Sequence, residues 1–157
     1  MIIALTGHRE QRLGLPSDVS TKEWESIRSW IRKQIIDSNA TEVFSGMAGG
    51  SDLAIAYEVA KMKEEGYHIK LTCVFPCKGY GTKSKHYSYI VGKADRIVNI
   101  HPKWQKGCDD DRDQYMVNHC DILLAVFDGQ KTGGVYSTIR KAEKIGKPII
   151  YCDVLGG

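Results

Sequence analysis

The sequence SGMAGGSD, residues 45–52, decides the fold expected for this chain. A short apolar run, residues 42–44, leads into it, and an amphipathic run, residues 53–60, leads out of it. That order indicates a strand, then a glycine-rich turn, then a helix. Ser51 is expected to be the N-cap of this helix, with Asp52 in its first turn.

The glycine-rich turn has two interpretations. Its glycines allow the backbone to adopt positive φ and to approach a ligand closely. The helix that follows presents free N–H groups and the positive end of its dipole at the same place. These properties predict a site for an anionic group such as a nucleotide phosphate. The alternative is a tight turn between strand and helix that binds no ligand, because glycine-rich turns are common in α/β folds.

The composition is that of one ordinary globular domain. The 157 residues are 42% hydrophobic and 26% charged, and no linker or repeat divides them, so residues 1–157 are expected to form a single domain. The formal net charge of +3 is too small to indicate duplex DNA or a membrane surface as a partner. No apolar run approaches the length of a membrane span, and the first residues lack the basic segment of a signal peptide.

The five cysteines are scattered and form no CxxC pair. Cys73 and Cys152 fall in predicted buried strands, which indicates reduced thiols and a cytoplasmic location rather than a disulfide framework. The set Cys73, Cys77, His86 and Cys108 contains residue types that bind zinc, but its spacing matches no usual zinc pattern. We therefore predict no metal site and no cofactor.

Apolar runs alternate with helical patterns along the whole chain. Strands are expected at residues 2–5, 42–44, 68–75, 95–100, 121–127 and 148–151, with Pro76 ending the third. Helices are expected at residues 21–37, 52–65, 86–93, 109–119 and 135–145, and loops at residues 10–20 and 77–85. The fold class predicted from this alternation is α/β, a single Rossmann-like three-layer domain with a mostly parallel open sheet.

Two further glycine-bearing turns follow predicted strands, TGHR at residues 6–9 and DGQKTGG at residues 128–134. Ligands of open α/β sheets bind outside the carboxyl ends of the strands, so both turns are candidate elements of a site. His8 and Arg9 offer donors to a phosphate or a base edge, although a surface salt bridge is the alternative for Arg9. The basic loop at residues 77–85 is expected either to close over an anion or to remain solvated.

The three turns, with the run RDQYMVNHCDILLAVFDGQKTGG at residues 112–134, carry a family resemblance. The chain resembles the SLOG superfamily, the Smf/DprA and LOG group of nucleotide-binding Rossmann-like domains, and within it the small YpsA-like branch. The resemblance implies one pocket for a nucleotide-derived small molecule, held by a sensor or sequestering module that can self-associate into a homo-oligomer. The ligand-binding residues that it implies are Gly7, His8, Arg9, Ser45, Gly46, Met47, Ala48, Gly50, Asp52, Asp128, Gly129, Gly133 and Gly134.

Departures from the family pattern bear on activity. LOG enzymes cleave the bond between base and ribose phosphate, and their motif is GGxGTxxE; here Ser137 replaces its threonine and Arg140 its glutamate. Such hydrolysis needs a carboxylate, which an arginine cannot replace. Asp52 and Asp128 keep a phosphoribohydrolase-like enzyme as an alternative. A DprA-like DNA-binding protein is a second alternative, but nucleic acid is not expected as a partner because no strongly basic groove or stacking aromatics are apparent. Arg112 is expected either to touch the ligand or to pair with an acidic residue behind the pocket.

Overall fold

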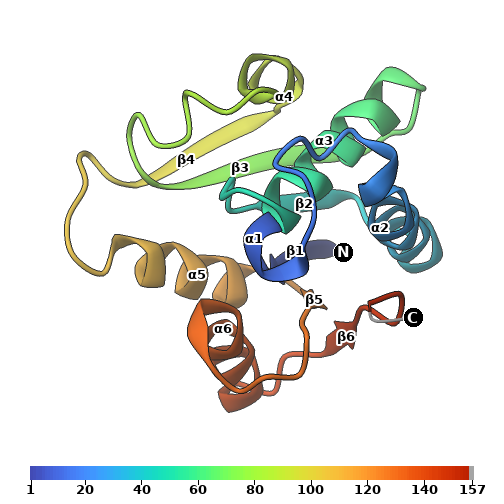
Figure 1. Cartoon of the computed structure of the whole chain (residues 1–157). Helices are drawn as coiled ribbons and strands as arrows, with labels where there is room; N and C mark the ends of the chain where they lie inside the picture. The colour runs from blue at the N-terminus through green and yellow to red at the C-terminus, as the bar shows by residue number, and fades with distance from the viewer. Residues whose placement is uncertain (156–157) are drawn as a thin grey trace.

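Six parallel strands form the centre of the structure, a computed structural model that describes residues 1–155 (Figure 1). The strands are β1 (Ile2–Gly7), β2 (Glu42–Ser45), β3 (Lys70–Cys77), β4 (Arg96–His101), β5 (Ile122–Val126) and β6 (Ile149–Tyr151). Their order in the sheet is β4-β3-β2-β1-β5-β6, and every neighbouring pair is parallel. This is the Rossmann-like α/β sheet expected from the alternating sequence pattern, with parallel pairing throughout.

Helices cover both faces of the sheet. They are α1 (Glu10–Leu13), α2 (Glu25–Ser38), α3 (Ser51–Glu64), α4 (Tyr87–Lys93), α5 (Cys108–His119) and α6 (Gly133–Lys144), with a 3-10 turn η1 (Lys22–Trp24) before α2. In β1, Ile3 and Leu5 belong to the core cluster under α2 and α3, whereas Ala4 between them belongs to the cluster under α5 and α6. This alternation places apolar side chains on both faces of a central strand, so β1 is buried from both sides.

The order of the strands creates a switch point between β1 and β5. From β1 the chain builds the sheet outward through β2 and β3 to β4, then returns to the other side of β1 with β5 and β6. Ligand sites of open α/β sheets lie outside the carboxyl ends of the strands at such a point. A ligand site is therefore expected at the turn that follows β1.

Two details differ from the pattern expected from sequence. Residues 10–13, expected as loop, form α1, which ends at Gly14 in the left-handed conformation with φ 68°. Pro76, expected to end its strand, lies inside β3, which continues to Cys77. Beyond Cys73 this strand pairs only with β4, so the N–H that proline lacks is not needed on the side of β2.

Candidate functional site

A cavity of about 400 Å³ lies at the carboxyl end of β1, at the switch point of the sheet. All three glycine-bearing turns contribute to its lining, together with α1 and the first turns of α5 and α6. The polar and charged part of the lining includes three arginines and three aspartates. These side chains are Arg9, Arg12, Arg112, Asp52, Asp109 and Asp113.

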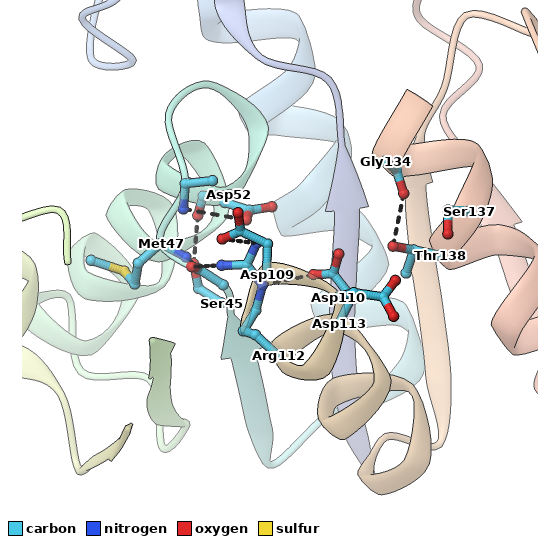
Figure 2. Close-up of polar contacts among 12 residues, drawn as sticks. Ser45, Met47, Asp52, Asp109, Asp110, Arg112, Asp113, Gly134, Ser137 and Thr138 are labelled. Atoms are coloured by element: carbon cyan, nitrogen blue, oxygen red, sulfur yellow. Dashed lines mark hydrogen bonds and ion pairs between the residues drawn. The ribbon is translucent and has the colours of Figure 1, made fainter. Parts of the chain in front are cut away.

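The SGMAGGSD turn is held together largely by its own polar groups (Figure 2). The Ser45 hydroxyl donates to the backbone oxygen of Asp52 at 2.7 Å and accepts the Met47 N–H at 3.2 Å. The Ala48 N–H donates to Oδ2 of Asp52 at 3.3 Å. Because these amides already have acceptors inside the protein, they are not free to bind a phosphate as the sequence pattern suggested.

Gly50 is required where two turns cross. Its φ is 76°, and a Cβ atom placed on it would lie 2.7 Å from the Cα of Arg9 and 2.8 Å from the backbone oxygen of His8. Gly50 takes the N-cap position that we expected for Ser51, and Ser51 donates both its N–H (3.2 Å) and its hydroxyl (2.7 Å) to the same His8 oxygen. The close approach that this glycine permits is thus between the turns after β1 and β2.

Arg112 extends from α5 into a buried charged cluster with Asp52 and Asp113 (Figure 2). Its Nη1 donates to the Gly46 oxygen at 2.5 Å, and its Nε donates to Asp113 at 2.7 Å. Burial alone would lower the pKa of Arg112, but the carboxylates of Asp113 and Asp52 raise it, so the guanidinium stays charged. Burial raises the pKa of Asp52 to about 7, against the opposing effect of Arg112. The cavity therefore contains a carboxyl group that can exchange a proton near neutral pH.

Asp52 is expected to make stability depend on pH. Its pKa is raised from 3.8 to about 7 in the folded chain, so between these values the folded state binds more protons than the unfolded state. The contribution of this group to the free energy of unfolding therefore falls as the pH rises through that window. Asp52→Asn cannot ionise, so we expect the wild-type Tm to fall relative to the Tm of this variant between about pH 4 and about pH 7. Calorimetry at matched ionic strength measures the difference, and a constant difference would show that Asp52 ionises near its ordinary pKa.

His8 and Arg12 connect the turn after β1 to the loop after β5. The side chain of His8 is buried, and its Nε2 accepts the Asp128 N–H at 3.2 Å. Burial, reinforced by Arg12, lowers the pKa of His8, so the ring is neutral at pH 7 with its proton on Nδ1. Arg12 binds the Asp128 carboxylate through two nitrogens, at 2.7 and 3.0 Å, and holds the pKa of that carboxyl well below its usual range. His8 therefore has a structural role through Nε2, and a contact of His8 with a ligand stays a prediction.

Arg9 and the first turn of α6 are the groups of the cavity best suited to an anion. Arg9 is exposed and donates to the Tyr80 hydroxyl at 3.2 Å, and none of the ion pairs found within residues 1–155 involves it. The first turn of α6 contains no acidic residue, and Thr132 before it makes no side-chain capping bond. Gly134 and Val135 of this turn line the cavity. The positive end of a helix dipole thus faces the same space as a guanidinium with no carboxylate partner.

Comparison with known proteins places the chain in a family. The YpsA family model, described as the YspA SLOG family, matches residues 3–151. The chain belongs to this family. It is also similar to the uncharacterized SPbeta prophage-derived protein YoqJ of Bacillus subtilis (strain 168), at 25% identity over 131 residues that cover 69% of this chain and 74% of that protein.

Within this SLOG fold, the predicted site residues fall into three groups. Gly7, His8, Arg9, Ala48, Asp52 and Gly134 line the cavity. Ser45, Gly46, Met47 and Gly50 do not line it and instead build the turn after β2 and its contacts. Asp128 and Gly129 belong to the loop that Arg12 holds through Asp128 and through the backbone oxygens of Gln130 and Thr132, and Gly133 begins α6 directly after this loop.

Sequence reasoning missed Arg12, Asp109 and Asp113 as lining residues. Arg12 lies three positions after Arg9, in the segment expected to be a loop, and recognition of the short helix α1 would have placed it beside the cavity. Arg112, which the resemblance singled out, pairs with Asp113, as one of its two expected roles required, and it lines the cavity, so contact with a ligand stays a prediction. Arg140, at the position of the LOG glutamate, is exposed and pairs with Glu143 outside the cavity.

Three further features were looked for in the part of the chain that the structure describes: a metal site, reactive thiols and a membrane-spanning helix. In residues 1–155, no three histidine, cysteine or acidic side chains are grouped so that they could hold a metal ion. The five cysteines are buried free thiols, and burial raises the pKa of Cys73 to about 12. Over the same residues, no helix has the length and apolar character that crossing a membrane requires.

Proposed function

We propose that this chain binds a nucleotide-derived small molecule in the cavity at the β1–β5 switch point and acts as a sensor or sequestering module. The observation that carries this proposal is the pairing of Arg9 with the uncapped first turn of α6 around one cavity. A phosphate there would receive charge-assisted hydrogen bonds from Arg9 and from backbone N–H groups of α6.

The acidic residues of the cavity support a nucleotide rather than a bare phosphate. Asp52, Asp109 and Asp113 offer acceptor oxygens on the side of α3 and α5, where sugar hydroxyls would donate to them. The volume of about 400 Å³ falls within the range of small-molecule sites. The cavity therefore offers donors for a phosphate and acceptors for a ribose.

Nucleoside monophosphates are expected to raise the Tm of the protein, while the corresponding nucleosides raise it much less. Ligands that bind only the folded state stabilise it by mass action, and the phosphate should supply most of the affinity. In titration calorimetry, Arg9→Ala should weaken nucleotide binding by roughly ten- to hundredfold, because one charge-assisted hydrogen bond contributes about 1.5–3 kcal/mol. The Tm of the free variant should change little, since the Arg9 side chain is exposed.

Two outcomes would contradict this proposal. Equal shifts for nucleotides and nucleosides would exclude a phosphate site in the cavity. If Arg9→Ala melts several degrees lower and binds nucleotides normally, Arg9 is a structural residue. Lys33→Ala is a suitable control because Lys33 is an exposed cation of α2 that pairs only with Asp37.

A phosphoribohydrolase is a second candidate function, favoured by one observation. Asp52 lines the cavity with its pKa raised by burial to about 7, a value suited to proton transfer at neutral pH. For the binding module we expect no free base above a buffer control when the protein is incubated with a panel of nucleoside monophosphates and the products are separated by chromatography. Steady release of base that Asp52→Asn abolishes would establish the enzyme instead.

A further inference from the structure

Two buried side-chain polar atoms within residues 1–155 have no hydrogen-bond partner, Oε2 of Glu10 and Oγ of Ser84. Both residues line one cavity of about 390 Å³, which shares no lining residue with the cavity at the switch point. Buried polar atoms in native proteins are nearly always paired with protein, water or ligand. That both unpartnered atoms belong to one cavity indicates that their partner comes from outside the chain.

Hydrogen bonds to Asp18 fix one wall of this second cavity. Asp18 accepts four hydrogen bonds, from the N–H and hydroxyl of Ser20 (2.9 and 2.6 Å), from Lys85 (2.6 Å) and from His86 (2.8 Å). These bonds fasten the segment before α4 to the segment after α1, and the His86 ring packs on Tyr57 with centroids 4.9 Å apart. Both oxygens of Asp18 thereby have partners, which leaves Glu10 as the carboxylate of the lining with an unpartnered oxygen.

Glu10 lies over Gly49, where a Cβ atom would come within 3.1 Å of Oε2. Glycine at this position therefore makes room for the carboxylate. An ionised carboxylate only accepts hydrogen bonds, so its partner must present N–H or O–H donors. Ser84 and the exposed Lys83 offer donors to an acceptor atom of the same ligand.

Among the common bases, guanine fits this arrangement best. Its Watson–Crick edge places two adjacent donors, N1–H and N2–H₂, next to the acceptor O6. Adenine and cytosine place one amino donor beside an acceptor, and uracil has a single N–H between two acceptors. We propose that the cavity between α1 and the segment before α4 binds a guanine base, with Glu10 accepting from N1–H and N2–H₂ and Ser84 donating to O6.

This proposal rests on the proposed function, because it names the base of the nucleotide class proposed above. Arg9 and Ala48 line the cavity at the switch point, while their chain neighbours Glu10 and Gly49 line the second cavity. Both spaces thus border the same two segments, α1 with the residue before it and the SGMAGGSD turn. Phosphate recognition and base recognition are assigned to consecutive residues of the same two turns.

Titration calorimetry of the intact chain with GMP, IMP and AMP tests the base preference. IMP lacks the 2-amino group, and all three share the same ribose phosphate. We expect wild type to bind GMP roughly tenfold or more tightly than IMP or AMP, as two charge-assisted hydrogen bonds allow. Glu10→Gln should bind the three nucleotides about equally, and Ser84→Ala should weaken GMP and IMP, which both carry O6, but not AMP. Glu23→Gln is the matched control, because Glu23 is an exposed carboxylate in η1, outside both cavities.

Guanosine distinguishes this proposal from the phosphate site. Binding of guanosine, followed by chemical shift changes in amide NMR spectra, should be lost in Glu10→Gln and kept in Arg9→Ala. If guanosine binds in this way while none of the nucleotides depends on Arg9, the guanine site stands and the phosphate site fails. Equal affinities for GMP, IMP and AMP in wild type, or a preference for GMP that persists in Glu10→Gln, would overturn the guanine site.

Discussion

Arg112→Ala is expected to lower the free energy of unfolding by about 3–5 kcal/mol, the usual effect of removing one partner from a buried ion pair. The Arg112 side chain is 6% exposed, and it is the positive charge beside the buried carboxyl of Asp52 and the half-buried carboxyl of Asp113. It also holds the Gly46 oxygen at 2.5 Å. Alanine would leave the Asp113 carboxyl and this oxygen without their donor and Asp52 without its nearby positive charge, and a Tm lower by about 10 °C should follow in calorimetry.

The pH dependence of this effect identifies its cause. Burial raises the pKa of Asp52 to about 7 and also raises the pKa of Asp113, so acidification neutralises Asp52 and reduces the need for Arg112. The cost of Arg112→Ala should therefore be smaller at about pH 5 than at about pH 8. Arg96→Ala is the control, because Arg96 is exposed and its pair with Glu42 spans 3.5 Å; such surface pairs contribute about 1 kcal/mol or less. A cost for Arg112→Ala as small as that of the control would show that the cluster does not hold the turn.

Gly50→Val is expected to destabilise the protein by about 3 kcal/mol or more, from two causes that act together. The positive φ of 76° strains any residue with a β-branched side chain, by about 1–3 kcal/mol. The Cβ would also lie 2.7 Å from the Arg9 Cα and 2.8 Å from the Glu10 nitrogen, which are backbone atoms that cannot rotate away. Overpacking of this kind adds about 1–3 kcal/mol. Nucleotide binding should be lost as well, because Arg9 would be displaced.

Gly66→Val separates the two causes of this loss. Gly66 has φ 99° and nothing within 4 Å of an added Cβ, so valine there carries the strain of positive φ without the clash. Urea denaturation of both variants should show a clearly larger loss for Gly50→Val. Equal losses would mean that the two turns can move apart and that their contact does not depend on glycine.

The sheet and most of its helices could be predicted because their signals are local. The uninterrupted run that forms β5 and the apolar spacing of Ile27, Ile31 and Ile35 in α2 each determine an element from a few neighbouring residues. Helix α1 was missed because four residues are too few to show a helical period. Pro76 was misjudged because its tolerance depends on β2 ending earlier, which concerns another segment.

The three turns of the site could be located from sequence, but not the bonds made within them. Arg12 meets Asp128 across 116 positions, and Ser51 meets the oxygen of His8 across 43. No local pattern records such contacts. From sequence, the N–H groups of Met47 and Ala48 are expected to bind a phosphate. In the folded chain, they donate to Ser45 and Asp52 instead. The sequence could predict that position 50 needs glycine. It could not predict that the backbone of residues 8–10 is the neighbour that imposes this need.

The central position of β1 has a consequence for how the chain folds. During synthesis β1 emerges first and pairs early with β2, through Ile3 and Val43. Its other edge stays open until β5 arrives, when Leu5 meets Leu124 after more than a hundred further residues. An apolar strand with one open edge is prone to pair with other chains, and contacts between such distant segments slow folding. Until β5 is synthesised, β1 therefore has one unpaired edge, and the pairing of β5 with this edge creates the switch point.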